Sequence, residues 1–395
     1  MIVEPKVRGF VCTTAHPAGC AVRVESEIRA ARALAGKGRP VRALVVGASQ
    51  GYGLSARIAL AFGLGSPTLG VFLEKPPSPG RTASAGWYST AAFAARAAEA
   101  GLECPSLSAD AFAPETLGRA LREARERWGG LDLLVWSLAA PRGVGADGRA
   151  KRSVLKPVGA PLEALGLDPF SGTLRRTSLP AATAEEIEET VAVMGGAPWE
   201  RWTRAVAEAG LATPGFRTVA FSYEGSSATR AVYRDGTIGR AKEDLERTAR
   251  ELDRFLAPLG GRAFASLEKA CPTQSAAAIP SVALYMALLG RELRKRGLDE
   301  DCGAQMRRLL SDFLFADPVP VDAQGRIRLD DRELLPEVQR AVERGLAAVE
   351  AGEAPDEALL AEAKADFLRI FGFGVPGVDE AAETETDLPI AGLLE

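Results

Sequence analysis

Cysteine, histidine and aromatic residues are scarce in this sequence. Of 395 residues, five are cysteine and one is histidine, and aromatic residues make up 6%. The cysteines are scattered without a Cys-x-x-Cys pair, so neither a disulfide framework nor a zinc site is expected, and no metal is predicted. The single histidine, His16, excludes any mechanism that needs two imidazoles. With no acidic partner nearby in sequence, it is expected to be a hydrogen-bonded structural residue rather than a base.

Long runs of one charge and long apolar runs are also missing. The formal net charge is −4, so neither a stripe for nucleic acid nor a polybasic membrane anchor is supported. No apolar run reaches the length of a membrane span, and residues 1–8 carry no signal-peptide core. We therefore expect a cytoplasmic protein that acts on small molecules. Its 47% hydrophobic residues are ample for a large core.

The stretch around residue 50 has the pattern of a strand, a turn and a helix. The apolar run ALVV at 43–46 is typical of a strand buried on both faces of a parallel sheet. Three glycines with the spacing Gly-x-x-x-Gly-x-Gly follow at 47–53, and helix formers continue over 54–64. Because the amides of a helix N-terminus favour negative charge, the turn is a candidate cradle for a pyrophosphate. An ordinary glycine-rich turn is the alternative.

Glu74 supports the dinucleotide interpretation. It ends the expected strand at 68–73 and lies 21 residues beyond Gly53. A carboxylate in that place accepts the two hydroxyls of the adenosine ribose and repels a 2′-phosphate. A surface glutamate at a strand end is the alternative. The neighbouring Lys75 makes the expected preference for NADH over NADPH a moderate one.

Strands and helices then alternate along the chain. A helix at 91–100, a strand at 104–107, a helix at 115–128 and a strand at 131–137 predict an α/β fold with a doubly wound parallel sheet of the Rossmann type. An N-terminal hairpin near 7–13 and extra C-terminal helices are expected to complete it. Ligands bind at the carboxyl ends of such strands. Candidates at these ends are Asp110, Ala111, Leu138 and Ala139.

The rest of the chain is expected to belong to one enlarged domain, 1–395. Residues 142–183 are rich in Gly, Pro, Arg and Lys and predict irregular hairpins that border the substrate. The acidic end from Glu380 is expected to be frayed. The predicted parts are the hairpin and helix at 1–40, the dinucleotide-binding core at 41–141, the substrate-binding and catalytic part at 142–300, and the helical extension at 301–395.

A tyrosine and a lysine carry the predicted chemistry. Thr237 is a plausible N-cap for a helix at 238–255. Nine residues of continuous helix would place Tyr233 and Lys242 on opposite faces, so Tyr233 must precede the helix and fold back toward Lys242. An ammonium near a phenol lowers the pKa of the phenol from about 10 and makes it a better proton donor. A half-buried tyrosine with a solvated lysine is the alternative.

A dispersed set of motifs runs almost from one end of the chain to the other. It comprises VRGFVCTTAHPAGC, VVGASQGYGL, GVFLEKP, AGWYSTAAF, LVWSLAAP, VAVMGG, FGFGVPGVD and the Tyr-x8-Lys pair with its IGRAK. This set resembles the FabV-type trans-2-enoyl-ACP/CoA reductases, a long offshoot of the short-chain dehydrogenase fold. The resemblance implies an enzyme of fatty-acid elongation that uses NADH to reduce the 2,3 double bond of an enoyl thioester of acyl-carrier protein or CoA, and a monomer.

The resemblance also implies roles for single residues. Tyr233 would be the proton donor, Lys242 would bind the nicotinamide ribose, and Tyr223 would contact the substrate. The implied contacts of NADH are Gly47, Ala48, Ser49, Gln50, Gly51, Tyr52, Leu73, Glu74, Asp110, Ala111, Leu138, Ala139, Lys242, Cys271, Pro272 and Thr273. One departure from the family is that Cys271 and Pro272 precede Thr273 where β-branched residues are expected. The C-terminal part of the family has been labelled flavin-binding, but no residue pattern here supports a flavin.

Two other functions stay open. A carbonyl or alcohol oxidoreductase of the same superfamily would act on a carbonyl and usually has a shorter Tyr-to-Lys spacing. A non-catalytic NAD(P)-binding sensor would lack the proton donor, whereas Tyr233 is present. The sequence does not decide between acyl-carrier protein and CoA as the carrier, nor the length of the acyl chain.

Overall fold

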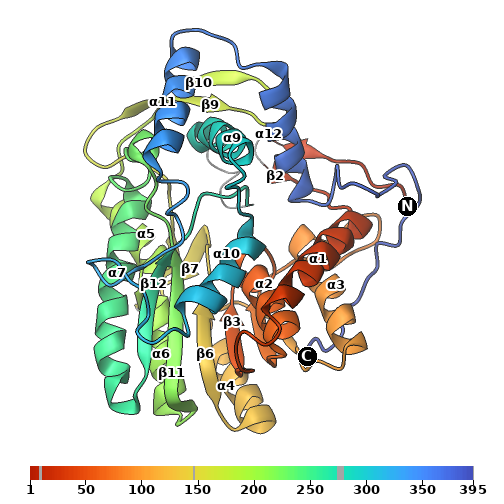
Figure 1. The fold of residues 1–395 in the computed structure, drawn as a ribbon, viewed down its shortest axis with the longest axis vertical. Coiled ribbons are helices and arrows are strands. Elements are labelled where there is room, and N and C mark those ends of the chain that lie inside the picture. The colour runs from red at the N-terminus through yellow and green to blue at the C-terminus, as the bar shows by residue number, and fades with distance from the viewer. Residues whose placement is uncertain (9–10, 146, 274–279, 395) are drawn as a thin grey trace.

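A parallel sheet lies at the centre of the computed structural model, which describes residues 1–8, 11–145, 147–273 and 280–394 (Figure 1). In this part of the chain the sheet has seven strands in the order β13-β12-β11-β6-β3-β4-β5, and every neighbouring pair is parallel. The strands are β3 (Ala43–Val46), β4 (Thr68–Phe72), β5 (Ser106–Ser108), β6 (Leu131–Trp136), β11 (Ala212–Ser222), β12 (Arg262–Leu267) and β13 (Ile327–Arg328). The predicted doubly wound sheet is confirmed, and its strand order changes direction between β3 and β6.

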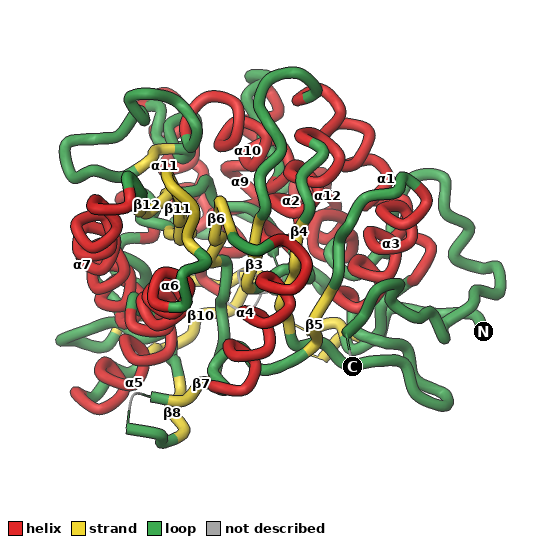
Figure 2. The backbone as a smooth tube through the Cα atoms, turned by 90° about the horizontal axis from the view of Figure 1, so that it is seen from below, coloured by secondary structure: helices red, strands yellow, loops and turns green. Residues whose placement is uncertain are grey.

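Both faces of the sheet are buried. Along β3, Ala43 and Val45 belong to one hydrophobic cluster, and Leu44 and Val46 belong to another. Helices cover each cluster, as Figure 2 shows from below. This is the reason for the unbroken apolar run in β3, since a strand covered on both faces has no polar side. The helices are α2 (Gly51–Ile58), α3 (Ala85–Glu99) and α10 (Cys302–Arg308) on one face, and α4 (Pro114–Trp128), α6 (Ala197–Glu208) and α7 (Thr237–Leu256) on the other.

Interactions between residues close in sequence order the N-terminal part of the chain. β1 (Val7–Arg8) and β2 (Val11–Cys12) form the predicted antiparallel hairpin. Helix α1 (Pro17–Ala31) begins at Pro17, because His16 caps it and proline fits the first helical position. The His16 Nδ1 accepts a hydrogen bond from the Gly19 amide at 3.3 Å, and the side chain is 1% exposed. The prediction of a structural histidine is confirmed.

Hairpins and helices from residues 142–194 and 280–369 lie beside and above the sheet (Figure 1). Two antiparallel hairpins, as predicted, lie within residues 142–183. Residues of β9, α9, α11 and α12 share one buried apolar cluster. The elements of this part are β7 (Arg142–Val144), β8 (Ala150–Arg152), β9 (Leu162–Leu167), β10 (Leu174–Leu179), α5 (Ala184–Met194), α9 (Pro280–Lys295), α11 (Pro336–Glu350) and α12 (Glu357–Arg369).

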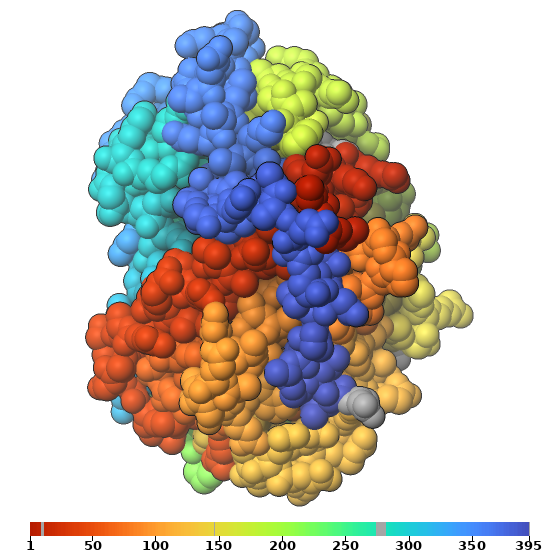
Figure 3. All heavy atoms as spheres, turned by 90° about the vertical axis from the view of Figure 1, so that its right-hand side faces the viewer, coloured from red at the N-terminus to blue at the C-terminus, as the bar shows by residue number. Residues whose placement is uncertain are grey.

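The C-terminal end is docked along the surface, so the prediction of a frayed end from Glu380 is wrong. Figure 3 shows the last residues crossing the face that the N-terminal third of the chain forms. The indole of Trp87 donates to the Leu388 carbonyl at 2.8 Å, and the Leu394 amide donates to the Ser106 carbonyl at 2.8 Å. Ile390 is only 6% exposed. Its apolar residues and these long-range hydrogen bonds order the end despite its acidic composition.

Short 3-10 and π turns extend several helices. No helix among the described residues is both long and apolar enough to span a membrane. The short turns are η1 (Arg32–Leu34), η2 (Ala59–Gly63), η3 (Ser227–Thr229), η4 (Ala257–Leu259) and η5 (Leu309–Phe313).

Candidate active site

The glycine loop lies at the point where the strand order changes direction. A Cβ on Gly47 would stand 2.5 Å from the Ser137 carbonyl oxygen after β6, and a Cβ on Gly53 would stand 2.0 Å from the Gly47 carbonyl oxygen. Side chains at these places would force β3, α2 and the end of β6 apart. The glycines therefore bring the N-terminus of α2 close to the crevice in which open α/β sheets bind ligands.

The first turn of α2 is open to an anion. Among the described residues, no side chain caps it, and its sequence has no acidic residue. Its amides lack partners within the helix, and the helix dipole favours negative charge at this end. The side-chain nitrogen Nε2 of Gln50, the N-cap residue, is also buried without a hydrogen-bond partner in the part of the chain described. The loop thus fits a dinucleotide pyrophosphate.

Glu74 lies between the glycine loop and the first turn of α3. Its Oε1 accepts a hydrogen bond from the Ser49 hydroxyl at 2.7 Å, and a Cβ on Gly86 would stand 2.0 Å from the same oxygen. The carboxylate is thereby held at the end of β4, where a ribose acceptor is expected. Leu73, the other candidate at this strand end, is 69% exposed.

The candidates at the ends of β5 and β6 lie on the same rim. Asp110 is exposed, and its Oδ1 accepts a hydrogen bond from the Phe112 amide at 2.9 Å. The Ala111 carbonyl accepts from the Trp202 indole at 3.0 Å, which fixes this turn against α6. Leu138 is half-buried and Ala139 is exposed. These small residues leave space along the rim.

Gln305 of α10, which sequence reasoning missed, engages two of the predicted cofactor contacts. Its amide nitrogen lies 3.1 Å from the Tyr52 hydroxyl and 3.3 Å from the Cys271 sulfur. The Tyr52 hydroxyl also donates to the Lys269 carbonyl. The side chains of Tyr52 and Cys271 therefore serve internal packing. Of the later loop, Pro272 is exposed, and the Cγ2 of Thr273 would lie 3.5 Å from a Cβ on Gly51 of the glycine loop.

Tyr233 precedes α7, as the spacing predicts, and its backbone lies against the first turn of that helix. A Cβ on Gly239 would stand 2.4 Å from the Tyr233 carbonyl oxygen, so this glycine permits the close approach. The predicted N-cap is wrong by one residue. Helix α7 begins at Thr237 and its N-cap is Gly236. The Thr237 hydroxyl instead donates to the Val154 carbonyl and joins α7 to the segment before β9.

Lys242 lies in the second turn of α7 and reaches the end of β11. Its ammonium donates a hydrogen bond to the Phe221 carbonyl at 3.0 Å. Burial disfavours the charged form and lowers the pKa of Lys242 to about 8, while the carboxylates of Glu268 and Glu246 act in the opposite direction. The side chain is therefore mostly protonated at pH 7 and loses its proton in mild alkali.

Tyr223 and Tyr233 stand edge to face, with ring centroids 4.9 Å apart and an interplanar angle of 79°. The Tyr223 hydroxyl donates to Glu333 Oε1 at 2.9 Å, whereas no described residue provides a hydrogen-bond partner for the Tyr233 hydroxyl. Burial raises the pKa of Tyr233 well above its usual value, and the charge of Glu333 raises it further. The prediction that Lys242 lowers this pKa is wrong, because these two effects dominate.

Glu333 is a site residue that sequence reasoning did not find. It follows β13 and is 0% exposed. Its carboxylate accepts hydrogen bonds from the hydroxyls of Tyr223 and Tyr285 and from the Ala270 amide. In the sequence it stands in the charged run Asp-Asp-Arg-Glu, which is typical of a solvated turn. Only the arrangement of distant segments reveals its role.

Comparison with protein families matches almost the whole chain. Residues 2–79 match the NAD(P)H binding domain of trans-2-enoyl-CoA reductase, and residues 81–315 match the trans-2-enoyl-CoA reductase catalytic region. Residues 321–384 match a family described as an enoyl reductase FAD binding domain.

Curated relatives and solved structures agree with these matches. An enoyl-[acyl-carrier-protein] reductase [NADH] of Opitutus terrae is 43% identical over 99% of this chain and 100% of its own length. One of Coxiella burnetii is 44% identical over 98% of both. The trans-2-enoyl-CoA reductase of Treponema denticola, solved with NAD, has a TM-score of 0.93 at 40% identity and covers 99% of this chain and 100% of its own. That of Clostridium acetobutulicum, solved with NADH, has a TM-score of 0.91 at 33% identity over 100% of both chains.

Residues 321–384 do not fit the flavin that their family description names. The helices α11 and α12 begin with Glu337 and Glu357 in their first turns, and these carboxylates would repel a pyrophosphate. One amide in the first turn of α12 also already has a partner, because the Asp356 carboxylate accepts a hydrogen bond from the Leu359 amide at 2.8 Å. Nor do the described residues bring three or more His, Cys, Asp or Glu together as a metal site.

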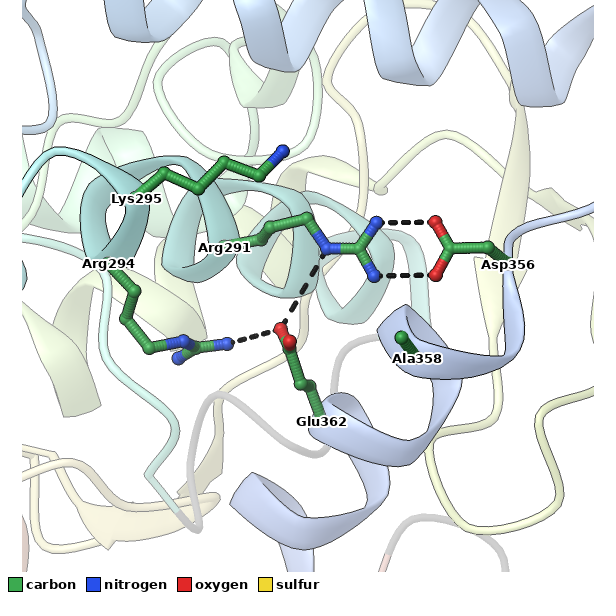
Figure 4. A pocket seen from close by; sticks show the side chains of 6 residues that line it. All are labelled: Arg291, Arg294, Lys295, Asp356, Ala358 and Glu362. Atoms are coloured by element: carbon green, nitrogen blue, oxygen red, sulfur yellow. Dashed lines mark hydrogen bonds and ion pairs between the residues drawn. The ribbon is translucent and has the colours of Figure 1, made fainter.

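A hollow beside this segment is lined by side chains that pair with one another. It measures about 470 Å³ and lies between α9 and α12 (Figure 4). Arg291 pairs with Asp356 at 2.5 Å, and Arg294 pairs with Glu362 at 2.8 Å. Arg291 and Arg294 therefore form ion pairs that join α9 to α12. The lining residues are Arg291, Arg294, Lys295, Asp356, Ala358 and Glu362.

Proposed function

Because this chain belongs to the trans-2-enoyl-CoA reductase family, we propose that it uses NADH to reduce the 2,3 double bond of a trans-2-enoyl thioester. The observation that carries the proposal is the Tyr233 hydroxyl. The ring of Tyr233 packs edge to face against that of Tyr223, which follows β11, and among the described residues the Tyr233 hydroxyl has no hydrogen-bond partner. A free phenol in this place is available to the substrate.

The proposed roles follow from where each group lies. The amides at the start of α2 hold the pyrophosphate of the cofactor, Glu74 accepts the adenosine ribose hydroxyls, and Lys242 donates to the nicotinamide ribose. NADH, when bound, supplies the hydride that is added to C3 of the substrate. The charge that then develops on the thioester oxygen is stabilised by a hydrogen bond from the Tyr233 hydroxyl. As the proton donor, Tyr233 gives its proton to the enolate and regains one from solvent.

The oxidation of NADH with different thioesters tests this function. We expect turnover with crotonyl-CoA and with a long-chain 2-enoyl thioester. Equal turnover of acetoacetyl-CoA would support a carbonyl reductase instead, and cofactor binding without turnover of any thioester would support a sensor. Parallel assays with the acyl-carrier-protein and CoA thioesters of one acyl chain would identify the preferred carrier. The proposal further includes a monomer that acts in the cytoplasm, which light scattering and cell fractionation test.

Replacing Glu74 by Ala is expected to raise the KM for NADH and to improve the relative use of NADPH. The ribose hydroxyls lose an acceptor, and a 2′-phosphate no longer meets a repelling charge. One charge-assisted hydrogen bond is worth roughly 1–2 kcal/mol, so the ratio of kcat/KM for the two cofactors should shift by about 5- to 30-fold. Ser49→Ala, which removes the partner of Glu74 but keeps its charge, is the matched control. An unchanged cofactor ratio in Glu74→Ala would place the ribose elsewhere.

A further inference from the structure

The carboxylate of Glu333 accepts hydrogen bonds from three donors that come from separate segments. Its Oε1 accepts from the Tyr223 hydroxyl at 2.9 Å and from the Tyr285 hydroxyl at 2.6 Å, and its Oε2 accepts from the Ala270 amide at 2.6 Å. The side chain of Glu333 is fully buried. A buried carboxylate with this many partners has one orientation, and it fixes the orientation of each donor in turn.

This carboxylate makes the two tyrosines of the site inequivalent. The proton of the Tyr223 hydroxyl is directed at Glu333, so it is not directed at a substrate oxygen. The ring of Tyr223 is consequently held in place, and the ring of Tyr233 packs edge to face against it. The Tyr233 hydroxyl, in contrast, donates to no described residue. Of the two phenols, Tyr233 is the one whose hydroxyl is not already bonded to another described side chain.

We propose that Glu333 is a positioning residue. It holds the ring of Tyr223 in place, and this ring packs against Tyr233 and orients the Tyr233 hydroxyl toward the reacting thioester. This inference rests on the function proposed above. Glu333 lies in residues 321–384, the segment whose family description names FAD. The segment would then serve the reaction by completing the tyrosine site of the catalytic region, not by binding a flavin.

The competing explanation is that Glu333 only ties the segment after β13 to the rest of the fold. In that case any loss of a partner would act through stability, and Tyr285 would matter as much as Tyr223. If Glu333 acts through Tyr223, replacing either residue removes the same effect on kcat. Replacing the second residue as well should then lower kcat no further. Double-mutant kinetics therefore separate the two explanations.

The experiment measures kcat, KM for crotonyl-CoA and KM for NADH in the full-length wild type, Glu333→Leu, Tyr223→Phe and the double variant. We expect each single variant to lose about tenfold in kcat, with KM for NADH within about twofold of the wild type, and the double variant to be no slower than the slower single one. Glu333→Gln, which keeps the shape and offers an acceptor on one side only, should recover part of the loss. It replaces Glu333→Leu in the cycle if the latter does not fold.

Tyr285→Phe is the matched control, since it removes the other phenol from the same carboxylate oxygen. We expect it to lower the thermal midpoint but to reduce kcat by less than about threefold. Losses that multiply in the double variant, or a loss in Tyr285→Phe equal to that in Tyr223→Phe, would overturn the positioning role. A wild type without enoyl reductase activity would overturn the proposed function, and this inference with it.

Discussion

Replacing Tyr233 by Phe is expected to lower kcat by about 10²-fold or more while the KM for the enoyl thioester stays similar. The substitution removes one hydroxyl and keeps the ring that packs against Tyr223. The hydrogen bond from this hydroxyl matters when charge develops on the thioester oxygen, so its loss acts on the transition state more than on substrate binding. Steady-state oxidation of NADH with crotonyl-CoA measures both constants.

The affinity for NADH is the internal control for this variant. It should stay within about twofold of the wild type, because Lys242 and not Tyr233 is proposed to hold the ribose. Tyr223→Phe should be the milder variant, since the hydroxyl of Tyr223 already donates to Glu333. If Tyr223→Phe abolishes activity and Tyr233→Phe retains a normal kcat, the proton donor has been assigned to the wrong tyrosine. If both variants stay fully active, the whole site is elsewhere.

Replacing Lys242 by Met should weaken NADH binding and lower kcat/KM by about 10²-fold, because the ribose loses a charged donor and the site loses a positive charge. The ammonium also donates to the Phe221 carbonyl in this structure, so its position is fixed before any ligand binds. Fluorescence titration with NADH and steady-state kinetics measure the two effects. Lys295→Met, on the exposed surface of α9, should leave both quantities unchanged.

The pH dependence of kcat/KM is a second test of the role of Lys242. Burial lowers the pKa of Lys242 to about 8, so the active ammonium form is present below that pH and is lost above it. The kcat/KM of the wild type should therefore fall as the pH rises through about 8. Tyr233 cannot cause this fall, since its pKa is raised well above the usual value for a phenol. In Lys242→Met the fall should be absent. A fall at the same pH in that variant would assign the titration to another group.

Local sequence patterns were sufficient for the parts of the fold that depend on neighbouring residues. The apolar run at 43–46 predicted a doubly covered strand, and the three glycines after it predicted a tight turn into a helix. Helical periodicity alone predicted that Tyr233 lies outside the helix of Lys242, and the backbone of Tyr233 approaches the first turn of that helix. The glycine at 239 is what makes that approach possible. Strand runs, turns and helical spacing are short-range properties, so the sequence displays them directly.

Residue roles that depend on distant segments were decided by the tertiary structure. The acidic C-terminal end is ordered because Trp87 and Ser106 provide partners for its backbone. Glu333 is a site residue because the chain after β13 brings it to Tyr223. The burial of Tyr233 and the charge of Glu333 raise the pKa of Tyr233, where the sequence predicted a decrease. A pKa depends on the solvent and charges that surround a group. Those surroundings are assembled from residues far apart in the chain, and no local pattern specifies them.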